Sequence, residues 1–151
     1  MKKKMVRFVL AFALVFVCFV LASCRHKETF QFLHSTDEIT AVSIVSLTFD
    51  ENKQLVQTEL TTVEDTNAFL RDFRSVDCYT YFGDPAGITP EGRNATVIKI
   101  SYRNMDYELI NWNGQAEYKT EKGLNYYTGF SVFDEKQFSA LIFKYYPSRS
   151  N

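Results

Sequence analysis

The chain has 151 residues, with 17 basic and 18 acidic side chains, 46% hydrophobic residues and 16% aromatic residues. This length and composition favour one compact domain and exclude a disordered, collagen-like or multi-pass membrane protein. The four basic residues of segment 1–23 have no acidic counterpart, which leaves 13 basic and 18 acidic side chains in the remaining 128 residues, a formal net charge of −5. A net-acidic body disfavours nucleic acid as the partner.

The N-terminal segment has the pattern of a secretion signal. Three lysines and Arg7 form a basic region, and an unbroken run of fifteen apolar residues extends from Phe8 to Ala22. A helix of this length spans about 22 Å, which is less than the roughly 30 Å hydrocarbon core of a bilayer. We therefore expect a signal peptide rather than a retained transmembrane anchor.

The end of this run, Leu21-Ala22-Ser23-Cys24, resembles the lipobox of bacterial lipoproteins, which combines a branched residue, two small residues and a cysteine. The resemblance implies attachment of diacylglycerol to the Cys24 thiol, cleavage after Ser23 and a mature protein held on the outer face of a bacterial membrane by its acylated first residue. Acyl chains contribute about 0.8 kcal/mol per buried methylene, so two or three of them make a lasting anchor. An ordinary secretory signal that happens to contain a cysteine is the alternative.

These features divide the chain into four parts: a signal peptide at 1–23, a lipidated tether at 24–28, a single domain at 29–147 and a polar tail at 148–151. The whole chain resembles small bacterial lipoproteins with a single α+β domain, and no family-specific motif occurs after Cys24. The expected location is the bacterial cell membrane, with the domain facing the extracytoplasmic side.

The first half of the domain predicts strands at Thr29–Leu33, Ile39–Phe49 and Leu55–Val63. The last two form a hairpin through the polar turn 50–53. Apolar residues change face partway along Ile39–Phe49, which indicates a bulge or a strand covered on both faces. A helix capped by Asp65 or Thr66 follows. Its apolar residues recur at helical spacing: Phe69, Leu70, Phe73 and Val76.

The second half predicts a meander followed by a helix. A strand at Cys78–Phe82 precedes Gly83–Asn94, a loop rich in glycine and proline. A type I′ turn is expected at Asn113-Gly114. Asp134 and Gln137 approximate a capping box for a helix that ends at Pro147. The meander strands are Ala95–Tyr102, Tyr107–Trp112, Gln115–Thr120 and Asn125–Phe133. The apolar stripe of the last helix is Phe138, Leu141, Ile142 and Tyr145.

Both predicted helices follow a strand with the same local pattern. Val63-Glu64-Asp65 with Phe69 matches Val132-Phe133-Asp134 with Phe138. This match indicates either that the domain consists of two duplicated sheet-then-helix halves, or that the same strand-to-helix connection occurs twice without duplication. In both cases the fold class is α+β: a single domain with an antiparallel meander sheet and two helices packed on one face.

The sequence carries no signature of catalysis or of metal binding. Its two histidines and the one cysteine of the predicted domain, Cys78, lack zinc-ligand spacing, and it has neither a P-loop nor a G-x-S-x-G elbow. We therefore predict no catalytic residue, no metal and no cofactor. Cys78 is expected to be a small buried residue, and a Cys78 and His34 dyad is the alternative. A pair of acidic residues facing each other could also serve hydrolysis.

Aromatic residues in the predicted strands indicate a binding surface. An antiparallel sheet commonly leaves one face open, and tyrosine offers a large contact area with a polar tip. The candidates are Tyr79, Tyr81, Tyr102, Tyr107, Trp112 and Tyr118, among Lys99, Glu108, Glu117 and Lys119. The alternative is that tyrosine is frequent because it favours strands. Three residues of the predicted loop are further binding candidates: Asp84, Ile88 and Arg93.

We therefore expect a membrane-anchored, non-catalytic module that binds a protein, peptide or cell-wall ligand, with membrane lipid as a partner through acylated Cys24. The alternatives are a cell-envelope hydrolase or accessory enzyme that uses acidic residues, and a ligand-binding component of a transporter. Desolvated carboxylates clustered in a pocket would favour the enzyme, and an exposed tyrosine patch would favour the binding module.

Overall fold

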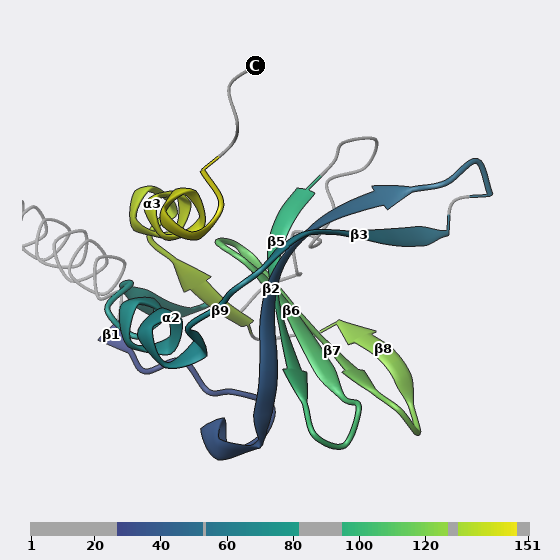
Figure 1. The fold of residues 1–151 in the computed structure, drawn as a ribbon, viewed down its shortest axis with the longest axis horizontal. Helices are drawn as coiled ribbons and strands as arrows, with labels where there is room; N and C mark the ends of the chain where they lie inside the picture. The colour runs from purple at the N-terminus through teal and green to yellow at the C-terminus, as the bar shows by residue number, and fades with distance from the viewer. Residues whose placement is uncertain (1–26, 53, 82–94, 127–129, 148–151) are drawn as a thin grey trace, which may run out of the picture.

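The computed structural model describes residues 27–52, 54–81, 95–126 and 130–147. These residues form one α+β domain with two antiparallel sheets and two α-helices (Figure 1). The predicted signal peptide, the lipobox, the loop Gly83–Asn94 and the polar tail lie outside the described residues.

The larger sheet has six strands in the order β3-β2-β5-β6-β7-β8. Neighbouring strands are antiparallel, and the predicted hairpin and most of the predicted meander are confirmed in it. Its strands are β2 (Ile39–Phe49), β3 (Leu55–Thr62), β5 (Ala95–Tyr102), β6 (Tyr107–Asn111), β7 (Gly114–Lys119) and β8 (Gly123–Tyr126).

The smaller sheet contains β1 (Lys27–Glu28), β4 (Cys78–Tyr81) and β9 (Phe130–Phe133) in the order β1-β4-β9. The prediction of one continuous strand at Asn125–Phe133 is wrong. This stretch forms parts of two strands, because β8 pairs with β7 in the larger sheet whereas β9 pairs with β4 in the smaller one. The strands that precede the two helices therefore lie in different sheets.

The predicted strand at Thr29–Leu33 is also wrong. Pairing with β4 is limited to the two residues of β1, and the chain then leaves the small sheet. The physical reason is aromatic packing: the ring of Phe30 lies 5.0 Å from that of Phe32 and 5.2 Å from that of Phe73, both edge to face. These contacts direct the segment into the core instead of along a sheet.

The helix α2 (Thr66–Phe73) begins as predicted, because the side chain of Asp65 accepts a hydrogen bond from the backbone N–H of Ala68 at 2.9 Å. The Asp65 cap satisfies one of the backbone donors that α2 leaves free at its start. A short 3-10 helix, η1 (Thr36–Glu38), precedes β2.

The helix α3 (Glu135–Tyr145) is capped by Asp134, which accepts from the backbone N–H of Gln137 at 3.0 Å. In the expected capping box the Gln137 side chain would also accept from the backbone N–H of Asp134, and this part of the prediction is wrong, because that N–H donates to the backbone carbonyl of Asp77. The Gln137 side-chain oxygen instead accepts from the backbone N–H of Asp77 at 2.8 Å. Gln137 therefore ties α3 to the start of β4 rather than closing its own helix end.

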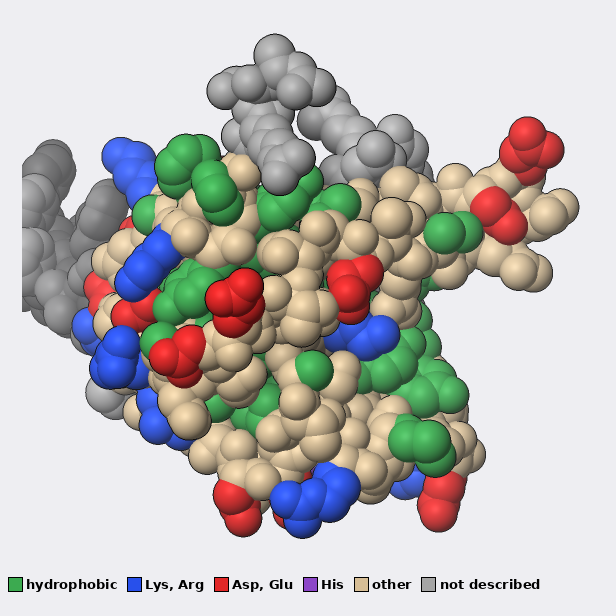
Figure 2. All heavy atoms as spheres, in the orientation of Figure 1, with side chains coloured by type: hydrophobic (Ala, Val, Ile, Leu, Met, Phe, Trp, Pro, Cys, Tyr) green, Lys and Arg blue, Asp and Glu red, His purple; other side chains and the backbone are tan. Residues whose placement is uncertain are grey.

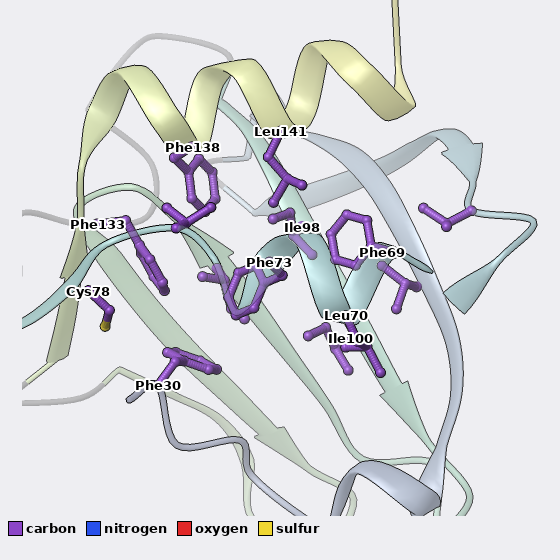
Figure 3. Packing of buried hydrophobic residues seen from close by; sticks show 14 of the residues in the cluster. Phe30, Phe69, Leu70, Phe73, Cys78, Ile98, Ile100, Phe133, Phe138 and Leu141 are labelled. Carbon is purple, nitrogen blue, oxygen red and sulfur yellow. The ribbon is translucent and has the colours of Figure 1, made fainter. Parts of the chain in front are cut away.

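Both helices pack on the same face of the six-stranded sheet, as predicted. Figure 3 shows Phe138 and Leu141 pointing from α3 into the cluster around Phe73, which comes from α2. The sheet contributes apolar residues to the same cluster from β2, β5 and β6. Its largest members are Phe30, Phe69, Leu70, Phe73, Ile98, Ile100, Tyr102, Ile110, Phe133, Phe138 and Leu141.

Of the two expected origins for the change of apolar face along β2, coverage on both faces is the one that the structure shows. Val42 packs into the helix-side core, whereas Val45 and Leu47 pack into a second cluster on the opposite face, so β2 is covered on both faces. The pairing of β2 with β3 also shifts register between Ile44 and Val45. Because the pairing of β2 with β5 continues unbroken there, the extra residue is Leu60, so this bulge belongs to β3 and does not change the face of β2.

The turn between β6 and β7 differs from the predicted type I′ turn at Asn113-Gly114. Asn111 pairs with Gly114, so the two turn residues are Trp112 and Asn113. None of these residues has a positive φ, which a type I′ turn requires. The Asn111 side chain stabilises the turn by accepting from the backbone N–H of Asn113 at 2.9 Å.

Candidate functional site

The six-stranded sheet curves away from the helices. The Gln57 side-chain amide on β3 donates to the Tyr107 hydroxyl on β6 at 3.0 Å, although β2 and β5 lie between these strands. In a flat sheet the two strands would be separated by three spacings, about 14 Å. The face opposite the helices, lined by Gln57, Lys99, Tyr107, Tyr118 and Leu124, is therefore concave, and we call it the concave face.

The floor of the concave face is a small apolar cluster. Both edge strands of the sheet lean onto it, through Leu55 of β3 and Leu124 of β8. Figure 2 shows hydrophobic side chains at the surface beneath the projecting β2–β3 hairpin, on the side where β6, β7 and β8 lie. The buried members of the floor are Val45, Leu47, Val97, Leu109 and Ala116.

Two tyrosines and a lysine form a stack on this floor. Tyr107 and Tyr118 pair across β6 and β7, and their rings lie 4.6 Å apart at an angle of 10°. The Lys99 ammonium on β5 lies 4.4 Å from the centre of the Tyr107 ring. Because β5 and β7 flank β6 on opposite sides, both faces of the Tyr107 ring are covered. A ligand would meet the ring edges, the hydroxyls and the ammonium group.

Lys99 places a positive charge on the concave face, beside the Tyr107 ring. Among the described residues its ammonium makes no ion pair. On the same face, the carboxylate of Glu59 accepts hydrogen bonds from the hydroxyls of Ser43 at 3.0 Å and Thr62 at 2.9 Å. The arrangement leaves Lys99 able to pair with a carboxylate from outside the domain.

The structure brings together two of the six aromatic candidates, Tyr107 and Tyr118. Tyr102 lies on the opposite face, where it is 3% exposed in the helix-side core. Tyr79 and Tyr81 lie in β4 of the smaller sheet, and Trp112 is in the turn after β6. The remaining candidates lie outside the described residues: Cys24, Asp84, Ile88 and Arg93.

Sequence patterns did not identify Gln57 as a site residue. Strand alternation puts Gln57 on the same face of β3 as Leu55. Because Leu55 packs against the floor of the concave face, this alternation would have placed Gln57 there once the face was known. Its contact with Tyr107 depends on the curvature of the sheet, which strand alternation does not reveal.

A second polar cluster lies on the helix side of the sheet, around the fully buried carboxylate of Glu108. It accepts hydrogen bonds from the Tyr102 hydroxyl, from the Gln115 amide at 2.9 Å and from the backbone N–H of Leu33 at 3.3 Å. Burial is the main reason that the pKa of Glu108 is raised to about 7, and the neighbouring carboxylate of Glu117 raises it further.

Next to this cluster, the carboxylate of Asp106 is held in its charged form. It accepts from the backbone N–H of Thr120 at 2.9 Å, from His34 at 2.8 Å and from the Asn104 amide at 2.9 Å. These hydrogen bonds, led by that of the Thr120 backbone, lower the pKa of Asp106 to about 2. A pocket of about 410 Å³ is lined in part by Asp106, and Glu108 is not among its lining residues.

Cys78 lies in the helix-side core and is 3% exposed. Burial raises the pKa of its thiol, which disfavours the reactive thiolate. The Nε2 atom of His34 is engaged by Asp106 instead. The geometry therefore gives no support to a nucleophilic pair of Cys78 with His34.

Within the described ranges, no group of three or more histidine, cysteine or acidic side chains could hold a metal ion. Neither described α-helix combines the length and apolar character needed to cross a bilayer. Comparisons with protein-family models, with curated proteins and with solved structures each returned no match to this chain.

Proposed function

We propose that this protein is a lipoprotein of the outer face of a bacterial membrane, whose domain binds an acidic peptide segment of another protein on the concave face. The single observation that carries the binding proposal is the stack of Lys99, Tyr107 and Tyr118 on the sheet face that the helices leave uncovered. The support for the membrane anchor is the lipobox-like sequence ending at Cys24.

The geometry of the stack favours a peptide over a sugar. Sugar rings are recognised through the open faces of aromatic side chains, and both faces of the Tyr107 ring are already covered by Lys99 and Tyr118. The half-buried ring edges and hydroxyls, set above an apolar floor, suit the side chains of a peptide. The ammonium of Lys99 adds a preference for aspartate or glutamate in that peptide.

The hydrolase alternative draws support from one observation, the buried carboxylate of Glu108 with its raised pKa beside Glu117. Its surroundings argue against catalysis. Glu108 is fully buried, three donors bind its carboxylate, and the pocket near Asp106 does not include it among its lining residues. A general acid must come within hydrogen-bond reach of its substrate, so we assign Glu108 to the core.

Site-specific photo-crosslinking in intact cells tests the binding proposal. A photoreactive phenylalanine at Tyr118 is expected to give a discrete adduct with a peptide that contains acidic residues, as identified by mass spectrometry. The matched control carries the same probe at Phe143, which is 63% exposed on α3. Lys99→Met should abolish the adduct without lowering the thermal unfolding midpoint. Equal adducts at both positions, or an unchanged adduct in Lys99→Met, would refute the proposal.

The anchor is tested separately by mass spectrometry of the protein purified from its native membrane. The expected N-terminal peptide begins with Cys24 and carries the mass of a diacylglyceryl group on its thiol. A peptide that still contains Met1, or an unmodified Cys24, would overturn the membrane location while leaving the concave face to its own test.

A further inference from the structure

The helix side of the domain contains a basic pocket that is separate from the concave face. It has a volume of about 450 Å³ and lies between η1 and α2. Figure 2 shows Lys and Arg side chains gathered on the side of the molecule where these two elements lie. The lining residues are Thr36, Asp37, Asn67, Leu70, Arg71 and Arg74.

The arginines of this pocket are without ion-pair partners among the described residues. The carboxylate nearest along α2, Asp72, is engaged by the Lys144 ammonium at 2.6 Å and by the Tyr145 hydroxyl at 2.6 Å. Asp37, inside the pocket, accepts a hydrogen bond from the Ser35 hydroxyl. Both carboxylates therefore have other hydrogen-bond partners. The Arg74 guanidinium donates to the Thr36 hydroxyl at 3.5 Å within the pocket, and Arg71 lies near enough to Asp72 to help lower the pKa of its carboxyl group, but neither arginine forms an ion pair among the described residues.

The positive charges converge from separate parts of the chain. Arg71 and Arg74 lie three residues apart at the end of α2, so both project from one side of the helix. Arg103, in the turn after β5, does not line the pocket but donates to the backbone carbonyl of Asp37, a lining residue, at 3.4 Å. A favourable interaction with the end of the helix dipole explains arginines on α2. It does not explain the approach of a third arginine from the sheet.

We propose that this pocket binds a phosphate group. Two guanidinium groups together with the Asn67 amide and the Thr36 hydroxyl offer more donors than the two oxygens of a carboxylate can accept, and arginine matches phosphate oxygens in bidentate fashion. Asp37 lies at the same pocket as an acceptor, which suits a hydroxyl carried by the phosphate or by its ester group. A free phosphate and the phosphodiester headgroup of a lipid share this chemistry.

Isothermal titration calorimetry on the full chain in mild detergent tests the pocket with two probes at constant ionic strength. The probes are inorganic phosphate and glycerophosphoglycerol, the deacylated headgroup of phosphatidylglycerol. Saturable binding of either probe is expected. Tighter binding of the diester assigns the pocket to a lipid headgroup, and tighter binding of inorganic phosphate assigns it to a free phosphate.

Matched variants distinguish specific binding in this pocket from nonspecific attraction of the probe to positive charge. Arg71→Gln and Arg74→Gln should each weaken binding by about tenfold or more, because each removes a bidentate donor. Lys122→Gln removes the same charge at a position that is exposed like Arg71 and Arg74 but does not line this pocket, and should change affinity by less than about twofold, since salt screens charges that do not contact the ligand. Absence of binding for both probes, or equal weakening in all three variants, would overturn the proposal. Thermal unfolding midpoints confirm that each variant is folded.

Discussion

The hydroxyl of Tyr102 donates a hydrogen bond to the carboxylate of Glu108, and both side chains are buried between the sheet and the helices. Tyr102 and Glu108 lie on adjacent strands, and the N-terminal segment covers them through the backbone N–H of Leu33. The pair makes the stability of the domain depend on the protonation of one carboxyl group.

The first prediction concerns this dependence. The pKa of Glu108 rises from its ordinary value of 4.5 to about 7 in the folded protein, so between these values the folded state holds a proton that the unfolded state releases. The contribution of Glu108 to stability is therefore complete below pH 4.5 and is lost as the pH rises through 7. We expect urea unfolding to show a loss of up to about 3 kcal/mol from this group between pH 4.5 and 8.

Glu108→Gln removes the titrating group while keeping its shape. This variant should lack the Glu108 component of the slope and be more stable than the wild type at pH 8. Glu121→Gln, at an exposed position, is the control and should keep the wild-type slope. An unchanged slope in Glu108→Gln would show that the buried carboxyl group is not its origin.

The second prediction concerns Asp106, whose pKa is lowered from 3.8 to about 2. Its contribution is present above the ordinary value and is lost as the pH falls from about 4 towards 2. Asp106→Asn should destabilise the domain at pH 7 by about 2 kcal/mol, since it weakens hydrogen bonds to a charged acceptor.

Thermal unfolding between pH 2 and 7 measures this effect. The difference between Asp106→Asn and the wild type should shrink towards acidic pH. Thr120→Val removes one hydroxyl donor at 3.1 Å and keeps the backbone donor, so its cost should be smaller, about 1 kcal/mol. A pH-independent difference for Asp106→Asn would contradict the assigned charge.

The third prediction concerns Phe73, which is 1% exposed and contacts the rings of Phe30, Phe69 and Phe133. Phe73→Ala should cost about 4 kcal/mol because it leaves a cavity at the centre of the aromatic cluster. Phe143→Ala, at an exposed position of α3, should cost less than about 0.5 kcal/mol. Chemical denaturation compares the two, and equal losses would show that the cluster does not dominate the core.

The fourth prediction concerns the start of α2. Asp65→Ala removes the acceptor for the backbone N–H of Ala68 and should cost about 1 kcal/mol. Asp65→Asn keeps an acceptor oxygen and should recover most of that loss. The free energies of unfolding of the two variants measure the cap, and identical values would place the effect in the charge rather than in the hydrogen bond.

Local patterns were enough to predict the helices and the long strands. The alternation of Ile98, Ile100 and Tyr102 with Val97, Lys99 and Ser101 identified β5, and the helical spacing from Phe69 to Phe73 identified α2. Both patterns depend only on neighbours in the chain.

Strand alternation also contained information about the tyrosines. Tyr102 shares its face of β5 with Ile98 and Ile100, and all three lie in the helix-side core. Tyr107 shares its face of β6 with Leu109, which lies in the opposite cluster. The sequence alone does not say which of these two faces the helices cover, so the two tyrosines could not be assigned to core and surface.

Features set by distant partners could not be predicted. The division of Asn125–Phe133 between two sheets depends on pairing of β9 with Cys78–Tyr81, about fifty residues earlier in the chain. The polar partners of Glu108 come from three separate segments, and the contact between Gln57 and Tyr107 spans four strands. Such contacts follow from the complete fold.

The short pairing of β1 has a mechanical consequence. β1 holds β4 through only two residue pairs, and Phe30, two residues beyond it, is wedged among the rings of Phe32, Phe73 and Phe133. A force applied to the backbone at Lys27 therefore first separates β1 from β4 and then acts on the aromatic cluster around Phe30. The six-stranded sheet has no direct pairing with β1. The concave face would keep its shape under a load that strains the opposite side of the domain.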